Sequence, residues 1–177
     1  MTTATAVRLT DAAEVERLLD VLARAIAADL SPDTALVGIV RRGAPLAQRL
    51  AERLRRQGHP VEVGELALKL YDDTLERLYE HPHLDASALD LDVKGRHLIL
   101  VDDVLYTGES LLRAVCHLHA AGARRLQIAV LCSRGRPLMP IHADFVGLRL
   151  EVDEGWIVEC HVPPYEEDFG IHLVQRP

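Results

Sequence analysis

Two kinds of apolar pattern follow one another in turn along the chain. Short runs rich in β-branched residues predict buried strands, which fall at residues 34–40, 61–70, 97–101, 126–132 and 144–147. Longer stretches with apolar residues three and four positions apart predict helices, which begin near residues 11, 45 and 111. Strands that alternate with helices are typical of parallel sheets. We therefore predict an α/β fold with a mostly parallel sheet flanked by helices.

Local signals mark the ends of the predicted helices. Asp11 or Thr10 is placed to cap the first helix, and Glu14 completes a capping box with Asp11. Gly58 and Gly122 follow the second and third helices, where a glycine commonly ends a helix. The tail predicts one further strand, a turn and a closing strand, and it then becomes acidic at residues 163–170.

The stretch from His97 to Ser110 carries the clearest chemistry. Its apolar run ends at Asp102 and Asp103, and a turn that contains Gly108 then opens a helix. Ligands of open α/β sheets bind outside the carboxyl ends of the strands, and the free N–H groups of a helix start favour an anion. Carboxylates suit sugar hydroxyls, so this stretch predicts a site for a ribose 5-phosphate.

A second anion site is predicted where the strand at 34–40 meets the next helix. Arg41, Arg42 and Gly43 lie at this junction, just before Pro45. Arginines at a strand end and helix start suit phosphate groups. The alternative is that both arginines are ordinary solvated surface residues.

Length and composition limit the classes of protein to which this chain can belong. The chain has 177 residues, of which 49% are hydrophobic, and we expect a single domain over residues 1–177. The sequence contains no apolar run approaching the roughly 20 residues of a membrane span, and its start lacks the features of a signal peptide. The three cysteines form no metal or disulfide pattern. We therefore expect a cytoplasmic protein without a membrane partner or a protein-held metal.

Residues 101–108, Val-Asp-Asp-Val-Leu-Tyr-Thr-Gly, resemble the phosphoribosyl pyrophosphate (PRPP) motif of type I phosphoribosyltransferases. The Val-Leu-Tyr in its middle is most similar to the PyrR family of pyrimidine-operon attenuators and uracil phosphoribosyltransferases. Further segments match that family in the same order, at residues 36–39, 42–43, 45–47, 63–66 and 140–147. The resemblance implies a small hood beside the sheet and a flexible active-site loop over about 71–94, whereas the tail at 149–177 departs from the family.

The resemblance also implies a reaction, in which the 5-phosphoribosyl group passes from PRPP to a nucleobase, uracil first, giving UMP and pyrophosphate. Mg²⁺ would be bound mainly through PRPP, and Asp102 and Asp103 would be the catalytic residues. The implied PRPP-binding residues are Val104, Leu105, Tyr106, Thr107, Gly108, Glu109, Ser110, Arg41, Arg42 and Gly43. In this family the pyrophosphate loop often contains a non-proline cis peptide. Ser133, Arg134 and Ile141 would border the base pocket.

Two alternatives remain open. A purine could replace uracil, because the tail is divergent and the family arginine is missing between Tyr71 and Asp72. The protein could instead be a non-catalytic regulator that senses a nucleotide and binds RNA, as the attenuators do. Their RNA-contacting helix matches Ala23, Arg24 and Ala27 or Ala28 here, so only the arginine remains. The net charge of −7 also argues against RNA. The resemblance further implies a homodimer.

Overall fold

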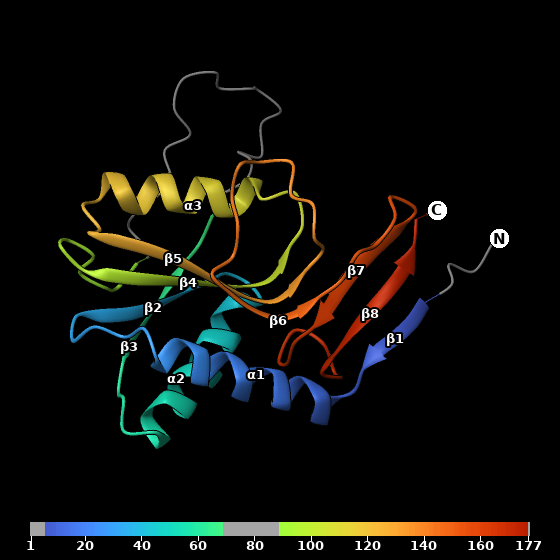
Figure 1. Ribbon diagram of the computed structural model, residues 1–177, viewed down its shortest axis with the longest axis horizontal. Helices are drawn as coiled ribbons and strands as arrows, with labels where there is room; N and C mark the ends of the chain where they lie inside the picture. The colour runs from blue at the N-terminus through green and yellow to red at the C-terminus, as the bar shows by residue number, and fades with distance from the viewer. Residues whose placement is uncertain (1–5, 69–88, 177) are drawn as a thin grey trace.

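The computed structural model describes residues 6–68 and 89–176. In chain order, its elements are β1 (Ala6–Thr10), α1 (Ala12–Ala27), β2 (Thr34–Ile39), α2 (Gly43–Arg56), β3 (Glu62–Leu66), β4 (His97–Leu105), α3 (Glu109–Ala120), β5 (Arg125–Ser133), β6 (Phe145–Arg149), β7 (Trp156–His161) and β8 (Gly170–Gln175). Figure 1 shows them as a helix-covered sheet with a smaller sheet beside it.

The larger sheet has five parallel strands in the order β3-β2-β4-β5-β6. Helices α1 and α2 cover one face and α3 covers the other (Figure 1). This arrangement confirms the predicted α/β fold with a mostly parallel sheet. None of the helices within the described ranges combines the length and the apolar character needed to cross a membrane.

Successive residues of the central strands supply two separate cores. Leu36, Ile99 and Val101 pack toward α1 and α2, whereas Val37, Leu98 and Leu100 pack toward α3. Every residue of β2 is buried. A strand covered on both faces needs a continuous apolar run, which is why the sequence pattern located these strands.

Capping signals set the helix ends as predicted. Asp11 is the N-cap of α1, and its carboxylate accepts from the N–H of Glu14 while the Glu14 carboxylate accepts from the N–H of Asp11. Gly58 and Gly122, which follow α2 and α3, have φ angles of +86° and +95°. These left-handed conformations favour glycine.

The smaller sheet is antiparallel, with the order β1-β8-β7, and we call it the hood. Ala6 pairs with Val174 in β8, so this sheet joins segments from the two ends of the described chain. The sequence of the tail predicted the strand at β7 but neither β1 nor β8. The isolated segment 6–10 is largely exposed, and its strand conformation depends on pairing with a distant partner.

Two sequence-based expectations need correction. The strand predicted to end at Val101 continues to Leu105, because Asp102, Val104 and Leu105 stay in register with β5. The aspartates therefore lie within β4 and not after it. The predicted flexible loop at about 71–94 falls mainly outside the described residues, but its last part is packed: Val93 is only 8% exposed and belongs to the core beneath α3.

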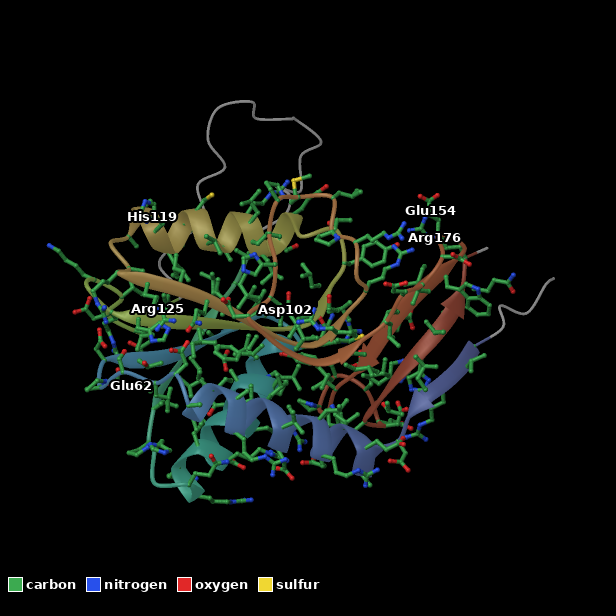
Figure 2. The ribbon with its side chains drawn as sticks, in the orientation of Figure 1. Glu62, Asp102, His119, Arg125, Glu154 and Arg176 are labelled. Carbon is green, nitrogen blue, oxygen red and sulfur yellow. The ribbon has the colours of Figure 1, made fainter. Side chains whose placement is uncertain are left out.

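The carboxyl ends of the parallel strands meet the hood near the centre of the molecule. Figure 2 shows Asp102 at this junction, with Arg176 on the hood side. Arg125, at the start of β5, and His119, near the end of α3, lie at the opposite edge. This junction is the edge at which α/β sheets bind ligands.

Candidate active site

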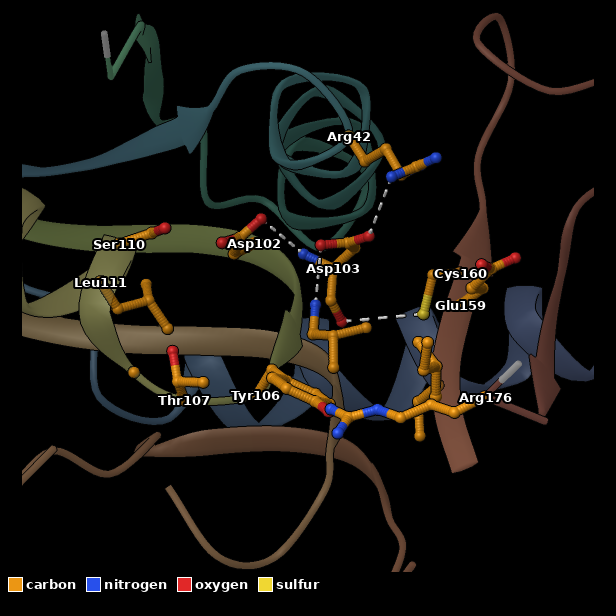
Figure 3. Close-up of a pocket in the computed structure, with 14 residues that line it drawn as sticks. Arg42, Asp102, Asp103, Tyr106, Thr107, Ser110, Leu111, Glu159, Cys160 and Arg176 are labelled. Carbon is orange, nitrogen blue, oxygen red and sulfur yellow. Dashed lines mark hydrogen bonds and ion pairs between the residues drawn. The ribbon is translucent and has the colours of Figure 1, made fainter. Parts of the chain in front are cut away.

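A pocket of about 440 Å³ lies between β4, the start of α3 and the hood. Figure 3 shows side chains from these elements converging on it. The pocket is lined by Arg42, Asp102, Asp103, Val104, Tyr106, Thr107, Gly108, Ser110, Leu111, Ile157, Val158, Glu159, Cys160 and Arg176. The volume lies within the usual range for small-molecule sites.

The two carboxylates of Asp102 and Asp103 lie side by side in this pocket (Figure 3). The N–H of Asp103 donates to Oδ1 of Asp102 at 2.9 Å, and the N–H of Val104 donates to Oδ1 of Asp103 at 2.8 Å. Burial raises the pKa of both carboxyls, and the charge of Asp103 raises the pKa of Asp102 further. Two adjacent buried carboxyls favour a ligand that brings hydroxyl donors or positive charge.

The turn before α3 requires a glycine because it packs closely against residues 137–141. Gly108 has a φ of +88°, and a Cβ at this position would lie 2.6 Å from Cγ2 of Ile141. The adjacent helix start presents N–H groups, and the hydroxyls of Thr107 and Ser110 line the same pocket. This combination suits an anion such as a phosphate.

The loop before α2 brings a guanidinium to the aspartates. The Val40–Arg41 peptide is cis, as the family resemblance implied. A Cβ on Gly43 would lie 2.2 Å from the carbonyl oxygen of Val101, so only glycine allows this approach of α2 to β4. As a result, Nη1 of Arg42 lies 4.0 Å from Oδ2 of Asp103.

Arg42 also binds the acidic segment at residues 163–170, for which the sequence predicted no role. Its Nε donates to Oε1 of Glu166 at 3.1 Å and its Nη2 donates to the same oxygen at 2.5 Å. The N–H of Val162 donates to the other carboxylate oxygen at 2.8 Å. Arg42 lowers the pKa of the Glu166 carboxyl, so an anionic ligand of Arg42 has to compete with Glu166.

An aromatic and cationic group forms the side of the pocket next to the hood. The guanidinium of Arg176 donates to the hydroxyl of Tyr106, and Arg134 lies over the same ring at 4.4 Å from its centroid. Ile157 and Val158 add an apolar wall. The thiol of Cys160 donates to the carbonyl of Asp103 at 3.9 Å, which places β7 against β4. Such a wall suits the flat face of a planar ring.

The structure brings most of the predicted site residues into one pocket, but not all. Among the predicted residues, Leu105 is directed into the core and is 3% exposed, and Ser133 is likewise buried at 4%. Arg41 lies over the ring of Tyr165, 4.7 Å from its centroid, and does not line the pocket. Other predicted residues that lie outside the lining are Gly43, Glu109, Arg134 and Ile141.

Sequence reasoning missed the part of the pocket that comes from the hood. Ile157, Val158, Glu159 and Cys160 belong to a strand that was predicted, but its pattern does not show which sheet it joins. Arg176 follows β8, which was not predicted at all. The acidic segment around Glu166 was the remaining signal, because an acid-rich stretch can pair with a site arginine.

Comparison with known proteins agrees with this geometry. A family model described as the phosphoribosyl transferase domain matches residues 8–168. The chain is 36% identical over 170 residues to the bifunctional protein PyrR of Elusimicrobium minutum, with 94% of this chain and 95% of the relative covered. It is 40% identical over 142 residues to the bifunctional protein PyrR of Acetivibrio thermocellus, with 79% and 76% covered.

The structure also resembles a solved hypoxanthine phosphoribosyltransferase of Trypanosoma cruzi. The two share a TM-score of 0.73 and 18% identity, and 96% of each chain is covered. At this level of identity the likeness concerns the fold. It confirms the type I phosphoribosyltransferase fold that the sequence motif predicted.

Proposed function

Because this chain belongs to the phosphoribosyltransferase family, among relatives named bifunctional protein PyrR, we propose that it transfers the 5-phosphoribosyl group of PRPP to uracil. The products would be UMP and pyrophosphate. The observation that carries this proposal is the convergence of Asp102 and Asp103 with the Gly108 turn and Arg42 around one pocket. Each of these groups suits a different part of PRPP.

PRPP would lie across the end of β4. Its 5-phosphate fits the turn, where the N–H groups of the α3 start and the hydroxyls of Thr107 and Ser110 face the pocket. Its ribose hydroxyls fit the carboxylates of Asp102 and Asp103. Its pyrophosphate fits Arg42, which lies 4.0 Å from Asp103 and would exchange Glu166 for the substrate.

In the reaction, the bond between C1 of the ribose and the pyrophosphate oxygen breaks as a nitrogen of the base bonds to C1. The bonding electrons leave with pyrophosphate, and the proton of the base nitrogen passes to the released pyrophosphate or to water. Positive charge develops on the ribose, as in other glycosyl transfers. The adjacent carboxylates of Asp102 and Asp103 stabilise this charge. Pyrophosphate is an activated leaving group, so no covalent enzyme intermediate is needed.

The site fits the Mg²⁺ that phosphoribosyltransferases generally use with PRPP. Mg²⁺ prefers oxygen ligands and commonly takes only one or two protein carboxylates beside substrate phosphates. Asp102 and Asp103 present such oxygens, and a nearby positive charge would favour the ionised form that burial opposes in both carboxyls. The ion would neutralise the departing pyrophosphate, while the aspartates orient the ribose.

The base would stack beside Tyr106, against Ile157 and Val158, with Arg176 at its edge. Uracil is the first choice because the relatives at 36% and 40% identity are named PyrR. A purine is the second candidate, since the hood supplies this wall and its sequence departs from the PyrR pattern. We place the reaction in the cytoplasm and propose a homodimer.

An RNA-binding regulator is the less favoured proposal because arginines on the surface of α2 are paired with acids of α1. Arg49 and Arg53 of α2 bind Glu16 of α1, and Arg53 also binds Asp20 at 2.7 Å. Ala23, at the position matched to the RNA-contacting helix, is fully buried. Binding to RNA relies on a basic surface, which these pairs weaken.

Pyrophosphate release tests the proposal directly. The protein is supplied with PRPP and Mg²⁺, and uracil, hypoxanthine, guanine, adenine and xanthine are added separately. We expect release with uracil and a loss of about 10²- to 10³-fold in kcat for Asp103→Asn. Asp153→Asn makes the same change on the exposed surface and should retain full activity.

The other outcomes are equally informative. Release with a purine and not with uracil would reject uracil as the substrate and assign the base preference to the hood. Release with no base, from protein that is folded by circular dichroism, would reject catalysis. The RNA-binding proposal would then be tested by titrating the protein with leader RNA.

A further inference from the structure

Two histidines and a carboxylate converge on the hood, outside the residues that line the pocket. They are His161 at the end of β7, Asp168 in the turn that follows, and His172 in β8. Their ligand atoms all lie within 4.8 Å of one another. Nδ1 of His161 is 2.6 Å from Oδ1 of Asp168, and Nε2 of His172 is 3.0 Å from Oδ2. The function proposed above uses none of these residues.

The three side chains are held but remain accessible. The imidazole rings of His161 and His172 are stacked, with centroids 4.1 Å apart and an interplanar angle of 27°. Residues 159 and 172 are paired across the two strands, as are residues 161 and 170, so the sheet fixes both rings. The side chains of His161, Asp168 and His172 are 28%, 39% and 14% exposed. An ion from solvent therefore has a path to atoms that are already close.

A fourth residue, Glu159, lies beside the other ring nitrogen of His161. Its carboxylate lies 3.8 Å from Nε2 of His161, on the opposite side of the ring from Asp168. A negative charge near Nε2 favours the tautomer with its proton on that nitrogen, which leaves the lone pair of Nδ1 free for a metal. Such an outer carboxylate is a regular feature of histidine metal sites.

The charge balance also suits a cation. The Asp168 carboxylate lies against both histidines, and Glu159 adds a second acidic group 3.8 Å from His161. Arg8, which is paired with His172 across β1 and β8, donates through its Nε and Nη2 to the carbonyls of Thr10 and Phe169. The backbone therefore binds its guanidinium.

We propose that His161, Asp168 and His172 form a binding site for a borderline divalent transition metal, of which Zn²⁺ is the representative. Two imidazole nitrogens with one carboxylate oxygen favour Zn²⁺, Co²⁺ or Ni²⁺ over Mg²⁺, which prefers oxygen ligands alone. The site is therefore distinct from the one proposed for Mg²⁺ with PRPP. A nitrogen–zinc distance of about 2.0–2.1 Å requires the nitrogens to move only slightly from Asp168.

The ion would restrict the motion of the turn between β7 and β8. Asp168 lies in this turn two residues after Glu166, which binds Arg42 in the pocket. A metal that joins both strands to the turn would restrict the movement of Glu166. Metal binding would thus affect the contact between Glu166 and Arg42 at the pocket, although the ion itself lies outside the pocket.

Isothermal titration with Zn²⁺ tests the site in the full chain. Every protein carries Cys116→Ser, because Cys116 is an exposed thiol and would itself bind zinc. We expect one tight Zn²⁺ per chain, with affinity reduced at least about 100-fold by His172→Asn or Asp168→Asn and about 10-fold by Glu159→Gln. His119→Asn is the matched control, since His119 lies on α3 far from the hood (Figure 2).

A second measurement does not depend on the variants folding. X-ray absorption of the zinc-loaded protein should show two imidazole nitrogens and a carboxylate oxygen at about 2.0–2.1 Å. The proposal is overturned if the protein binds no zinc, if zinc binds equally to His172→Asn, or if the bound ion shows no imidazole ligands. In each of those cases the cluster acts only as a hydrogen-bonded group.

Discussion

The carboxyl of Asp102 is buried in the fold, and burial opposes its ionisation. Its pKa is raised well above 3.8, first by burial and then by the charge of Asp103. In the unfolded chain the same carboxyl ionises near 3.8. The stabilising contribution of this group is therefore fully present below pH 3.8 and is lost as the pH rises through the folded pKa.

Asp102→Asn should therefore stabilise the protein at neutral pH while reducing transferase activity. Asparagine cannot ionise, yet its oxygen can still accept from the N–H of residue 103. Urea unfolding should give a higher free energy of unfolding for the variant at pH 7, and the gain should disappear below pH 3.8. An unchanged or lowered stability at pH 7 would contradict this account of the site.

The pair between Arg42 and Glu166 predicts a variant that binds substrate better. Arg42 is 43% exposed, so solvent screens the pair and its strength is below about 1 kcal/mol. Glu166→Gln should lower the KM for PRPP by about two- to fivefold, with little change in kcat, because pyrophosphate then meets less competition. The measurement is initial-rate kinetics over a range of PRPP concentrations.

Glu167→Gln provides the control for this experiment. It removes the same charge from the neighbouring position, which is exposed. A similar change in KM for both variants would attribute the effect to net charge and reject competition at Arg42.

At the scale of elements, the site depends on how closely the start of α2 approaches β4. Gly43→Ala would place a methyl group 2.2 Å from the carbonyl oxygen of Val101. Backbone has to move to relieve this clash, at a cost of about 1–3 kcal/mol. We expect a lower free energy of unfolding in urea and weaker PRPP binding, since Arg42 moves with the loop.

Gly155→Ala is the matched substitution for that test. A Cβ at Gly155 meets no atom within 4 Å, so its stability should change by less than about 0.5 kcal/mol. Equal effects at Gly43 and Gly155 would show that the contact with Val101 is unimportant.

The elements differ in how well they could be predicted from the sequence. The strand β2 and most of β4 were predictable because burial on both faces needs an unbroken apolar run. The Asp102–Ser110 part of the site was predictable because one continuous segment supplies it. The hood was not, because β1 becomes a strand only by pairing with β8, and Arg176 enters the pocket only through that pairing.

At the scale of the whole molecule, the net charge of −7 is accompanied by arginines that are paired with acidic residues on the surface. Asp29 binds Arg125 and Asp33 binds Arg124, each at 2.8 Å. These pairs lie at the edge of the sheet opposite the pocket, so Arg124 and Arg125 are matched by acids from the segment after α1. Exposed pairs of this kind add little stability, and their main consequence is a surface without a strong basic field.

The pairing of Ala6 with Val174 has a consequence for folding order. Contacts so distant in sequence require a large loop to close before they contribute any stabilisation, so the hood should assemble after the parallel sheet and open before it. Hydrogen exchange monitored by mass spectrometry should show faster exchange in β1, β7 and β8 than in β2 and β5. Equal protection would mean that the two sheets fold as one cooperative unit. If the hood opens first, the part of the pocket wall formed by Ile157, Val158, Glu159, Cys160 and Arg176 is a transient structure, and a bound ligand can leave through partial unfolding while β4 remains intact.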